Sequence, residues 1–223
     1  MIPIRDTIPS RRPAWTVRLL VMLNLVVFWV EAGQGPAVEG LIYQFGVVPR
    51  LWWQTSLVDV GRWAQLAVTL VSSQFLHGGL LHLGSNMLYL WIFGDNVEDR
   101  LGPARFLTLY LVCGMIAAVT QLLMEPFGTV PMIGASGAIA GVLGAYLVFF
   151  PAARIVTLVP WLLWRFVDVP AFVFLGLWFL LQWVQGMTTI GQLAEGGVAW
   201  WAHVGGFIGG MIIATKIAPR PRF

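Results

Sequence analysis

Apolar residues along this chain gather into six segments that are separated by charged and turn-forming residues. The segments are roughly Val17–Ala32, Leu80–Gly94, Ala104–Met124, Ser136–Phe150, Val169–Gln185 and Val198–Thr215. Most of them approach the length of about 20 residues that an α-helix needs to cross the hydrocarbon core. Because lipid cannot satisfy free backbone groups, each segment is predicted to be helical. The pattern therefore predicts an all-α polytopic membrane protein with six transmembrane helices.

The composition supports this class. Of the 223 residues, 58% are hydrophobic and 10% are charged, whereas a soluble domain carries about 25% charged residues. The sequence pI is about 9.5, but the basic residues lie between the apolar segments and form no single patch, so no nucleic-acid partner is expected. The single cysteine, Cys113, excludes an intrachain disulfide.

The distribution of basic residues predicts the orientation of the spans. With six spans, both termini lie on the same side of the membrane. A cytoplasmic placement of the termini leaves Arg50 and Arg62 outside and the other 11 of the 13 basic residues inside, in agreement with the positive-inside rule. We therefore expect a short cytoplasmic tail at 1–15, a six-helix membrane domain at 16–217 and a cytoplasmic tail at 218–223.

The connection from Gly33 to about Gln74 is too long and too apolar for a simple linker. It carries several tryptophans, among them Trp52 and Trp63, and such residues favour the membrane interface. We expect this connection to lie in the outer headgroup zone. The segment Pro151–Val167 is expected to be its counterpart on the inner surface.

Four polar residues from three of the segments are predicted to lie at similar depth. At 1.5 Å per residue, Ser136 lies about 21 Å above the inner end of its helix, and His82 and His203 lie about 20 Å above theirs. Asn86 follows His82 by one turn on the same face. A lone residue of this kind is more often a packing or hydrogen-bonding device. Several together, at a depth where polar groups are costly and usually face the bundle interior, indicate a site.

Serine beside histidine is the minimal pair of nucleophile and general base. No Asp or Glu lies within the six segments apart from end residues, so we expect a dyad of Ser136 and His203. Ser136 begins its helix, where the first backbone N–H groups lack intrahelical partners. These groups, with His82 and Asn86, are expected to stabilise a developing oxyanion.

Glycines are predicted to bring the nucleophile and the base together. Gly137 and Gly141, and Gly206 and Gly210, have the GxxxG spacing that lets two membrane helices touch closely. No metal or other cofactor is expected, because histidines without an intramembrane carboxylate make a poor metal site and no zinc-helix motif is present.

Three motifs together resemble the rhomboid family of intramembrane serine proteases. They are Gly134-Ala135-Ser136-Gly137, Ala202-His203-Val204-Gly205-Gly206, and His77-Gly78-Gly79-Leu80-Leu81-His82 followed by Asn86-Met87. Their order and spacing fit the six-helix core of that family from about residue 15 to 217. The combination is specific, although each motif alone is not.

The resemblance implies a role for each site residue. Ser136 would be the nucleophile, His203 its base, and His82 and Asn86 part of the oxyanion hole. The family pattern also brings in two supporting residues, Gly134 of the serine motif and His77 as a structural or water-retaining histidine.

The resemblance also concerns substrate access. The connection Gly33–Gln74 looks like the membrane-embedded first loop of the family, and the fifth segment with the loop Gly186–Gly197 looks like its lateral gate and cap. The position one turn after the nucleophile, often aromatic in the family, is Ala140. The sequence therefore leaves open what orients His203.

These features predict a membrane endopeptidase whose substrates are transmembrane proteins that enter from the lipid bilayer. The expected location is a bacterial inner membrane. One alternative is a catalytically inactive rhomboid-like protein that binds transmembrane helices. A transporter or channel is the other, but the intramembrane ionic residues or paired broken helices typical of that class are missing.

Overall fold

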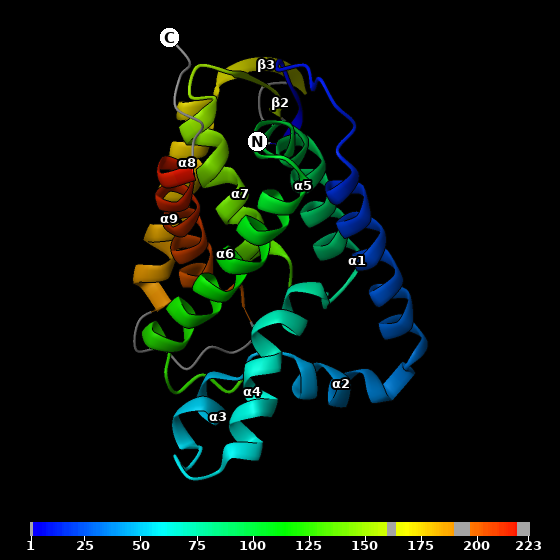
Figure 1. Cartoon of the computed structure of the whole chain (residues 1–223), viewed down its shortest axis with the longest axis vertical. Coiled ribbons are helices and arrows are strands. Elements are labelled where there is room, and N and C mark those ends of the chain that lie inside the picture. Colours follow the sequence, from blue (N-terminus) through cyan, green and yellow to red (C-terminus); the bar gives the residue numbers. More distant parts are fainter. Residues whose placement is uncertain (1, 160–163, 190–196, 218–223) are drawn as a thin grey trace.

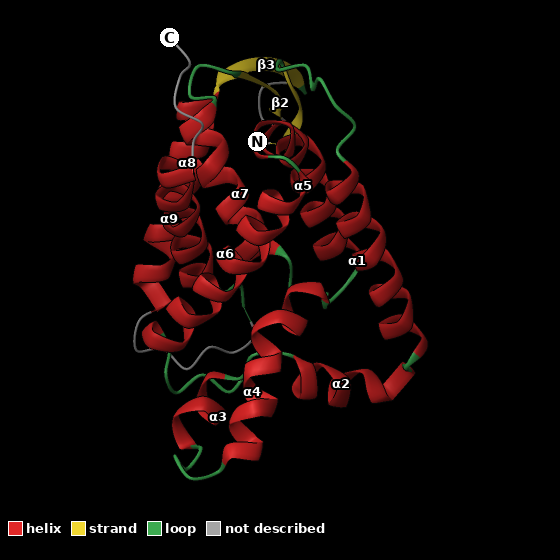
Figure 2. Ribbon diagram, viewed as in Figure 1, coloured by secondary structure: helices red, strands yellow, loops and turns green. Residues whose placement is uncertain are grey.

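The structure is a computed structural model that describes residues 2–159, 164–189 and 197–217. Helices form most of it, and a small sheet lies at one end (Figure 1; Figure 2). The α-helices are α1 (Trp15–Gly33), α2 (Val38–Phe45), α3 (Pro49–Gln54), α4 (Val60–Ser72), α5 (Leu80–Leu101), α6 (Pro103–Met124), α7 (Ser136–Phe149), α8 (Ala171–Thr189) and α9 (Trp200–Ile217). The 3-10 helices η1 (Gly35–Ala37) and η2 (Ser73–Phe75) lie between α1 and α5.

Each of the six predicted apolar segments is helical, as α1 and α5 to α9. Among the described residues, α1, α6 and α8 are each long and apolar enough to cross a membrane. The segment from α4 to α5, which bends by 81° at its break, adds a fourth candidate if it is counted as one span. The protein is therefore a mainly helical, multi-pass membrane protein.

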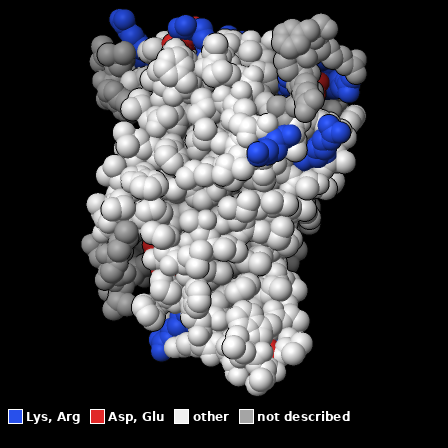
Figure 3. Space-filling model, turned by 60° about the vertical axis from the view of Figure 1, so that its left-hand side comes forward, with Lys and Arg blue, Asp and Glu red and all other residues white. Residues whose placement is uncertain are grey.

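The surface of the bundle fits a lipid environment. On the face in Figure 3, most basic side chains lie toward one end, and a wide uncharged surface separates them from the other end. Large apolar side chains of α1 and α8 point outward, including Leu19, Trp29 and Leu181. Outward-facing groups of this kind are satisfied by lipid and would be costly in water.

Helix α7 lies at the centre of the bundle. Its residues from Gly137 to Tyr146 are buried, and α5, α6, α8 and α9 pack around it (Figure 1). Its closest neighbour is α9. A Cβ on Gly206 would collide with the carbonyl oxygen of Gly137, and a Cβ on Gly210 would collide with that of Gly141. The predicted glycine contact is confirmed.

The connection after α1 is largely helical and lies at the end of the molecule opposite the sheet (Figure 1). Trp52 and Trp63 meet edge to face with ring centroids 5.8 Å apart. Trp53 Nε1 donates a hydrogen bond of 2.9 Å to the carbonyl of Leu122 at the end of α6. The connection is thus packed against the bundle, in agreement with the prediction that it is more than a simple linker.

The sheet is an addition to the all-α expectation. It consists of β1 (Ile2–Asp6), β2 (Arg154–Val159) and β3 (Arg165–Pro170), antiparallel in the order β1-β2-β3. The sequence pattern predicts only a tail at the N-terminus and a surface segment after α7. The short strands β1 and β2 lie far apart in the chain but pair here. The local periodicity of a strand does not show which other strand it pairs with.

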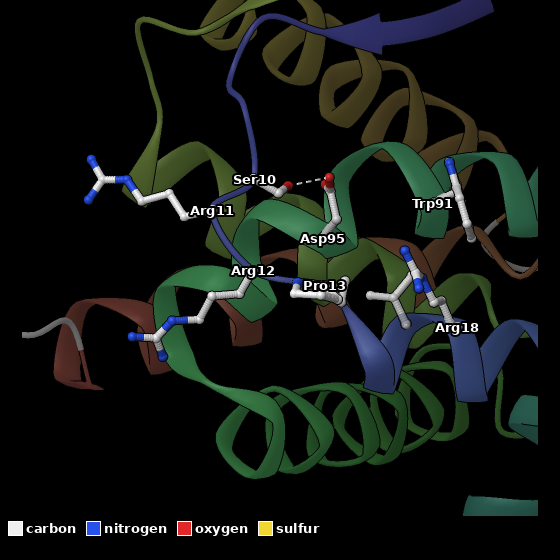
Figure 4. Close-up of a pocket in the computed structure, with 9 residues that line it drawn as sticks. Ser10, Arg11, Arg12, Pro13, Arg18, Trp91 and Asp95 are labelled. Carbon is white, nitrogen blue, oxygen red and sulfur yellow. Dashed lines mark hydrogen bonds between the residues drawn. The ribbon is translucent and has the colours of Figure 1, made fainter.

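The N-terminal segment is fixed to the end of α5. The Glu98 carboxylate accepts hydrogen bonds of 2.9 Å from the backbone N–H groups of Thr16 and Val17, which begin α1. Ser10 Oγ donates to Asp95 at 2.5 Å, a contact visible in Figure 4. The Glu98 carboxylate thus satisfies two donors that the start of α1 leaves free.

Asp6 links the sheet to the bundle. Its carboxylate accepts hydrogen bonds from Tyr146 Oη at 2.5 Å and from Asn96 Nδ2 at 2.8 Å. Burial raises the pKa of Asp6 to about 6. The expected tail at 218–223 and most of the expected cap at Gly186–Gly197 lie outside the described residues.

Candidate active site

The structure brings Ser136 and His203 together. Ser136 is the first residue of α7, and His203 lies in the first turn of α9. Ser136 Oγ and His203 Nε2 are 2.8 Å apart and share a hydrogen bond. His203 is only 8% exposed. The separation of 2.8 Å between Oγ and Nε2 suits a nucleophile and its general base.

The other ring nitrogen of His203 has a partner that the sequence analysis missed. His203 Nδ1 lies 2.7 Å from Gln182 Oε1, on α8. The ring of Trp178, also on α8, packs against the imidazole with centroids 5.8 Å apart. The one available signal was a glutamine inside an apolar segment, a costly residue that tends to face the bundle.

His82, Asn86 and Gly134 lie close together beside Ser136. His82 Nδ1 accepts a hydrogen bond of 3.4 Å from the backbone N–H of Gly78, which in a neutral imidazole leaves the ring proton on Nε2. A Cβ placed on Gly134 would lie 2.7 Å from His82 Nε2 and 3.7 Å from Asn86 Nδ2. Asn86 Nδ2 is buried and has no partner in the described structure. The Nε2 of His82 and the Nδ2 of Asn86 thus both lie near Gly134, two residues before Ser136.

Gly134 must be glycine for two reasons. Its φ of +119° lies in a region that side chains disfavour, and the imidazole of His82 fills the space that a Cβ would need.

His77 lies behind His82 and is absent from the cavity lining. It is 2% exposed, and its backbone N–H lies 3.2 Å from both oxygens of the Glu31 carboxylate. His77 Nδ1 is 3.2 Å from the carbonyl oxygen of Phe75, and its ring centroid is 5.1 Å from that of His82. These contacts fit a supporting position for His77 behind His82.

The loop before Ser136 is held by the connection that follows α1. Met132 and Val47 form an antiparallel bridge with backbone hydrogen bonds of 2.8 and 3.0 Å. The backbone N–H of Gly134 donates to the carbonyl of Ser73 at 2.8 Å. The segment from α1 to α5 therefore positions the loop before Ser136, a role that the sequence pattern does not predict.

A cavity of about 860 Å³ contains the site and lies between α5, α7, α8 and α9. It reaches from Gly78 at one end to Tyr89 and Leu143 deeper in the bundle, and Ser136 and His203 are in its wall. Its described lining includes no Asp, Glu, Lys or Arg. Such a lining can surround an uncharged peptide segment while a few polar groups act on one carbonyl.

The family assignment follows from a comparison with known protein families. The model of the Rhomboid domain matches residues 64–220, which is most of the chain and includes His77, His82, Asn86, Gly134, Ser136, Gln182 and His203. The chain belongs to the rhomboid family.

Several rhomboid relatives resemble parts of the chain. "Rhomboid protease GluP" of Bacillus subtilis is 34% identical over 136 residues, which cover 61% of this chain and 24% of the relative. "Rhomboid protein 1, mitochondrial" of Saccharomyces cerevisiae is 30% identical over 161 residues, covering 68% and 42%. "Presenilin-associated rhomboid-like protein, mitochondrial" of Homo sapiens is 34% identical over 94 residues, covering 40% and 24%. The matched part thus spans less than half the length of each of these relatives.

Proposed function

We propose that this protein is an intramembrane serine endopeptidase that hydrolyses peptide bonds in or near the transmembrane segments of other membrane proteins. The observation that carries the proposal is the 2.8 Å hydrogen bond between Ser136 Oγ and His203 Nε2 in the wall of an apolar cavity. Membership of the rhomboid family, with a relative named as a protease, supports a hydrolytic role.

Acylation begins at Ser136. His203 Nε2 takes the proton of the serine hydroxyl as Oγ attacks the scissile carbonyl carbon. The carbonyl oxygen becomes an oxyanion that accepts hydrogen bonds from His82 Nε2–H, Asn86 Nδ2–H and the backbone N–H of Ser136. Fixed donors of this kind stabilise the transition state more than the ground state, by about 3 kcal/mol each.

Collapse of the oxyanion breaks the C–N bond of the peptide. The protonated His203 gives its Nε2 proton to the leaving amine, and the acyl group stays on Ser136 Oγ. His203 then takes a proton from a water molecule that attacks the ester. The second oxyanion collapses, the acid product leaves, and the proton returns to Ser136 Oγ.

The substrate enters from the lipid bilayer on the side between α5 and α8. The scissile carbonyl of an intact helix is bonded within the helix, so the segment must unwind locally before Ser136 can attack it. The length of the cavity, from Gly78 to Leu143, supports binding of an extended segment there.

The proposal includes six spans, formed by α1 and α5 to α9, with both termini in the cytoplasm. The membrane domain then covers 16–217, residues 1–15 with β1 and residues 218–223 lie on the cytoplasmic side, and the membrane is a bacterial inner membrane. The excess of basic residues on one side of the predicted spans supports this orientation.

The test uses the purified chain in liposomes with a labelled single-span membrane protein. Wild type should cleave it, while Ser136→Ala and His203→Ala should not, at unchanged melting temperature. Cleavage that persists in Ser136→Ala would overturn the mechanism. Binding of the substrate by all three forms without cleavage would favour the inactive, helix-binding alternative.

A further inference from the structure

The contact between α8 and the imidazole of His203 has no place in the Ser-His dyad. We propose that Gln182 is a positioning residue that fixes the orientation and the tautomer of His203, where a serine triad uses an acidic residue. This inference rests on the proposed function and adds a third member to the same site.

The hydrogen bonds of the amide define which way it points. Gln182 Nε2 donates to the carbonyl of Trp178, one turn earlier on α8, at 3.2 Å. A carbonyl oxygen cannot donate, so the nitrogen of the amide is on that side and Oε1 is the atom 2.7 Å from His203 Nδ1. Oε1 can only accept, and the proton of the neutral imidazole therefore lies on Nδ1.

This tautomer is the one that the reaction needs. With the proton on Nδ1, His203 Nε2 has a free lone pair facing the hydroxyl of Ser136, 2.8 Å away. The opposite tautomer would present an N–H to the serine and could not remove its proton. The hydrogen bond from His203 Nδ1 to Gln182 thus selects the reactive tautomer of the base.

A simpler role for Gln182 would be a hydrogen bond that only joins two membrane helices. The surroundings of the ring argue for more than that. The aromatic neighbours Trp178 and Trp200 contact the ring, at centroid distances of 5.8 and 6.3 Å, but neither offers an acceptor to Nδ1 because an indole only donates. Ala140, one turn after Ser136, is too short to support the ring. Among the described residues, Gln182 is the polar partner of Nδ1.

An amide suits this position because it accepts without carrying charge. A carboxylate in a membrane interior without a partner is expensive, and Gln182 is only 7% exposed. The neutral acceptor stabilises the imidazolium less than a carboxylate does, since charge-assisted hydrogen bonds are roughly twice as strong. Its removal should therefore cost less than the ~10⁴-fold loss seen when the aspartate of a serine triad is changed.

The kinetic test replaces Gln182 with Met, which has similar length and no acceptor of comparable strength. In liposomes with a single-span substrate, Gln182→Met should lower kcat about 10- to 100-fold and leave KM within about twofold, because the loss falls on proton transfer. Gln182→Glu, which keeps an acceptor oxygen at the same reach, should restore most of the activity. The matched control is Gln185→Met, an exposed position on the same helix, which should match wild type.

The spectroscopic test does not depend on cleavage. The chain has three histidines, so ¹⁵N-histidine labelling gives few ring signals, and His203→Ala identifies the relevant pair. Wild type and Ser136→Ala should show His203 protonated on Nδ1, whereas Gln182→Met should show mixed tautomers. A Gln182→Glu variant should shift the Nδ1 proton resonance, because its acceptor changes.

The outcomes separate the two hypotheses. If wild type cleaves no substrate, the proposed function is overturned. If Gln182→Met still loses the Nδ1 tautomer in that case, the positioning contact stands. An unchanged tautomer with kcat within about twofold of wild type would overturn the role of Gln182. If Gln182→Met fails to fold, an Nδ1 resonance in Gln182→Glu that equals the wild-type signal overturns it instead.

Discussion

The contact between α7 and α9 offers the sharpest test of how packing produces the site. Gly206 lies three residues after His203 and faces the backbone of α7 next to Ser136. In Gly206→Ala, the added Cβ would collide with the carbonyl oxygen of Gly137 and would lie 3.1 Å from its carbonyl carbon. Both obstacles are backbone atoms of a buried helix, so no side chain can turn away to make room.

The size of the effect follows from the separation that the methyl group needs. A carbon and a carbonyl oxygen approach to about 3.3 Å, so α9 must move away from α7 by roughly 1 Å at this level. The Ser136–His203 hydrogen bond of 2.8 Å would then exceed the limit for such a bond. A misplacement of about 1 Å costs on the order of 100-fold in rate, and the overpacking costs about 1–3 kcal/mol of stability.

The assay measures kcat on a single-span substrate in liposomes and the melting temperature in detergent. The matched control is Gly209→Ala on the same helix, where the new Cβ would meet the Ile116 side chain at 3.1 Å. That side chain can yield, so activity should stay within about threefold of wild type. Equal activity of Gly206→Ala and wild type would refute the view that this backbone contact sets the distance between nucleophile and base.

Three further predictions concern other contacts. Asn86→Ala should lower kcat about 100- to 1000-fold with little change in KM, because its donor acts on the oxyanion. Glu98→Ala should lower the unfolding free energy by about 1–3 kcal/mol, since it leaves the buried backbone N–H groups of Thr16 and Val17 unpaired. Burial raises the pKa of Asp6 from 3.8 to about 6, so its protonation stabilises the fold fully below about pH 4, and this contribution is lost as the pH rises through about 6. For this partly exposed group, the unfolding free energy should change by about 1–2 kcal/mol between pH about 4 and 7. Melting curves at the two pH values should show this change in wild type and a smaller one in Asp6→Asn.

The sequence was sufficient for the helices and for the pair at the centre of the site. Apolar segments near membrane length become helices because the backbone has no other partner in lipid. Once helical, their constant rise puts Ser136 and His203 at one level, and the glycines permit the approach. These inferences need only local periodicity and one geometric constant.

Gln182 was missed because the sequence of an apolar helix does not show which of its sides faces the bundle. On α8 nearly every side chain is apolar, so no amphipathic pattern says which side meets α9. The sheet escaped for a related reason: Asp6 pairs with Ile155 across most of the chain, and only the fold brings the two together. Glu98, a buried carboxylate at the start of another helix, likewise depends on long-range placement.

The support of the base by α8 bears on how a substrate can enter. A helix that moves as a lateral gate would carry Gln182 away from the imidazole if it separated from α9. The aromatic contacts favour opening between α5 and α8. Phe179 of α8 packs on Phe207 of α9 with ring centroids 4.9 Å apart. Phe93 of α5 and Phe174 of α8 have ring centroids 6.3 Å apart. The cavity is lined by α5 residues from Leu80 to Tyr89 and by Trp178 of α8. Opening between α5 and α8 would therefore admit a substrate segment while α8 stays on α9 and keeps the base in its reactive tautomer.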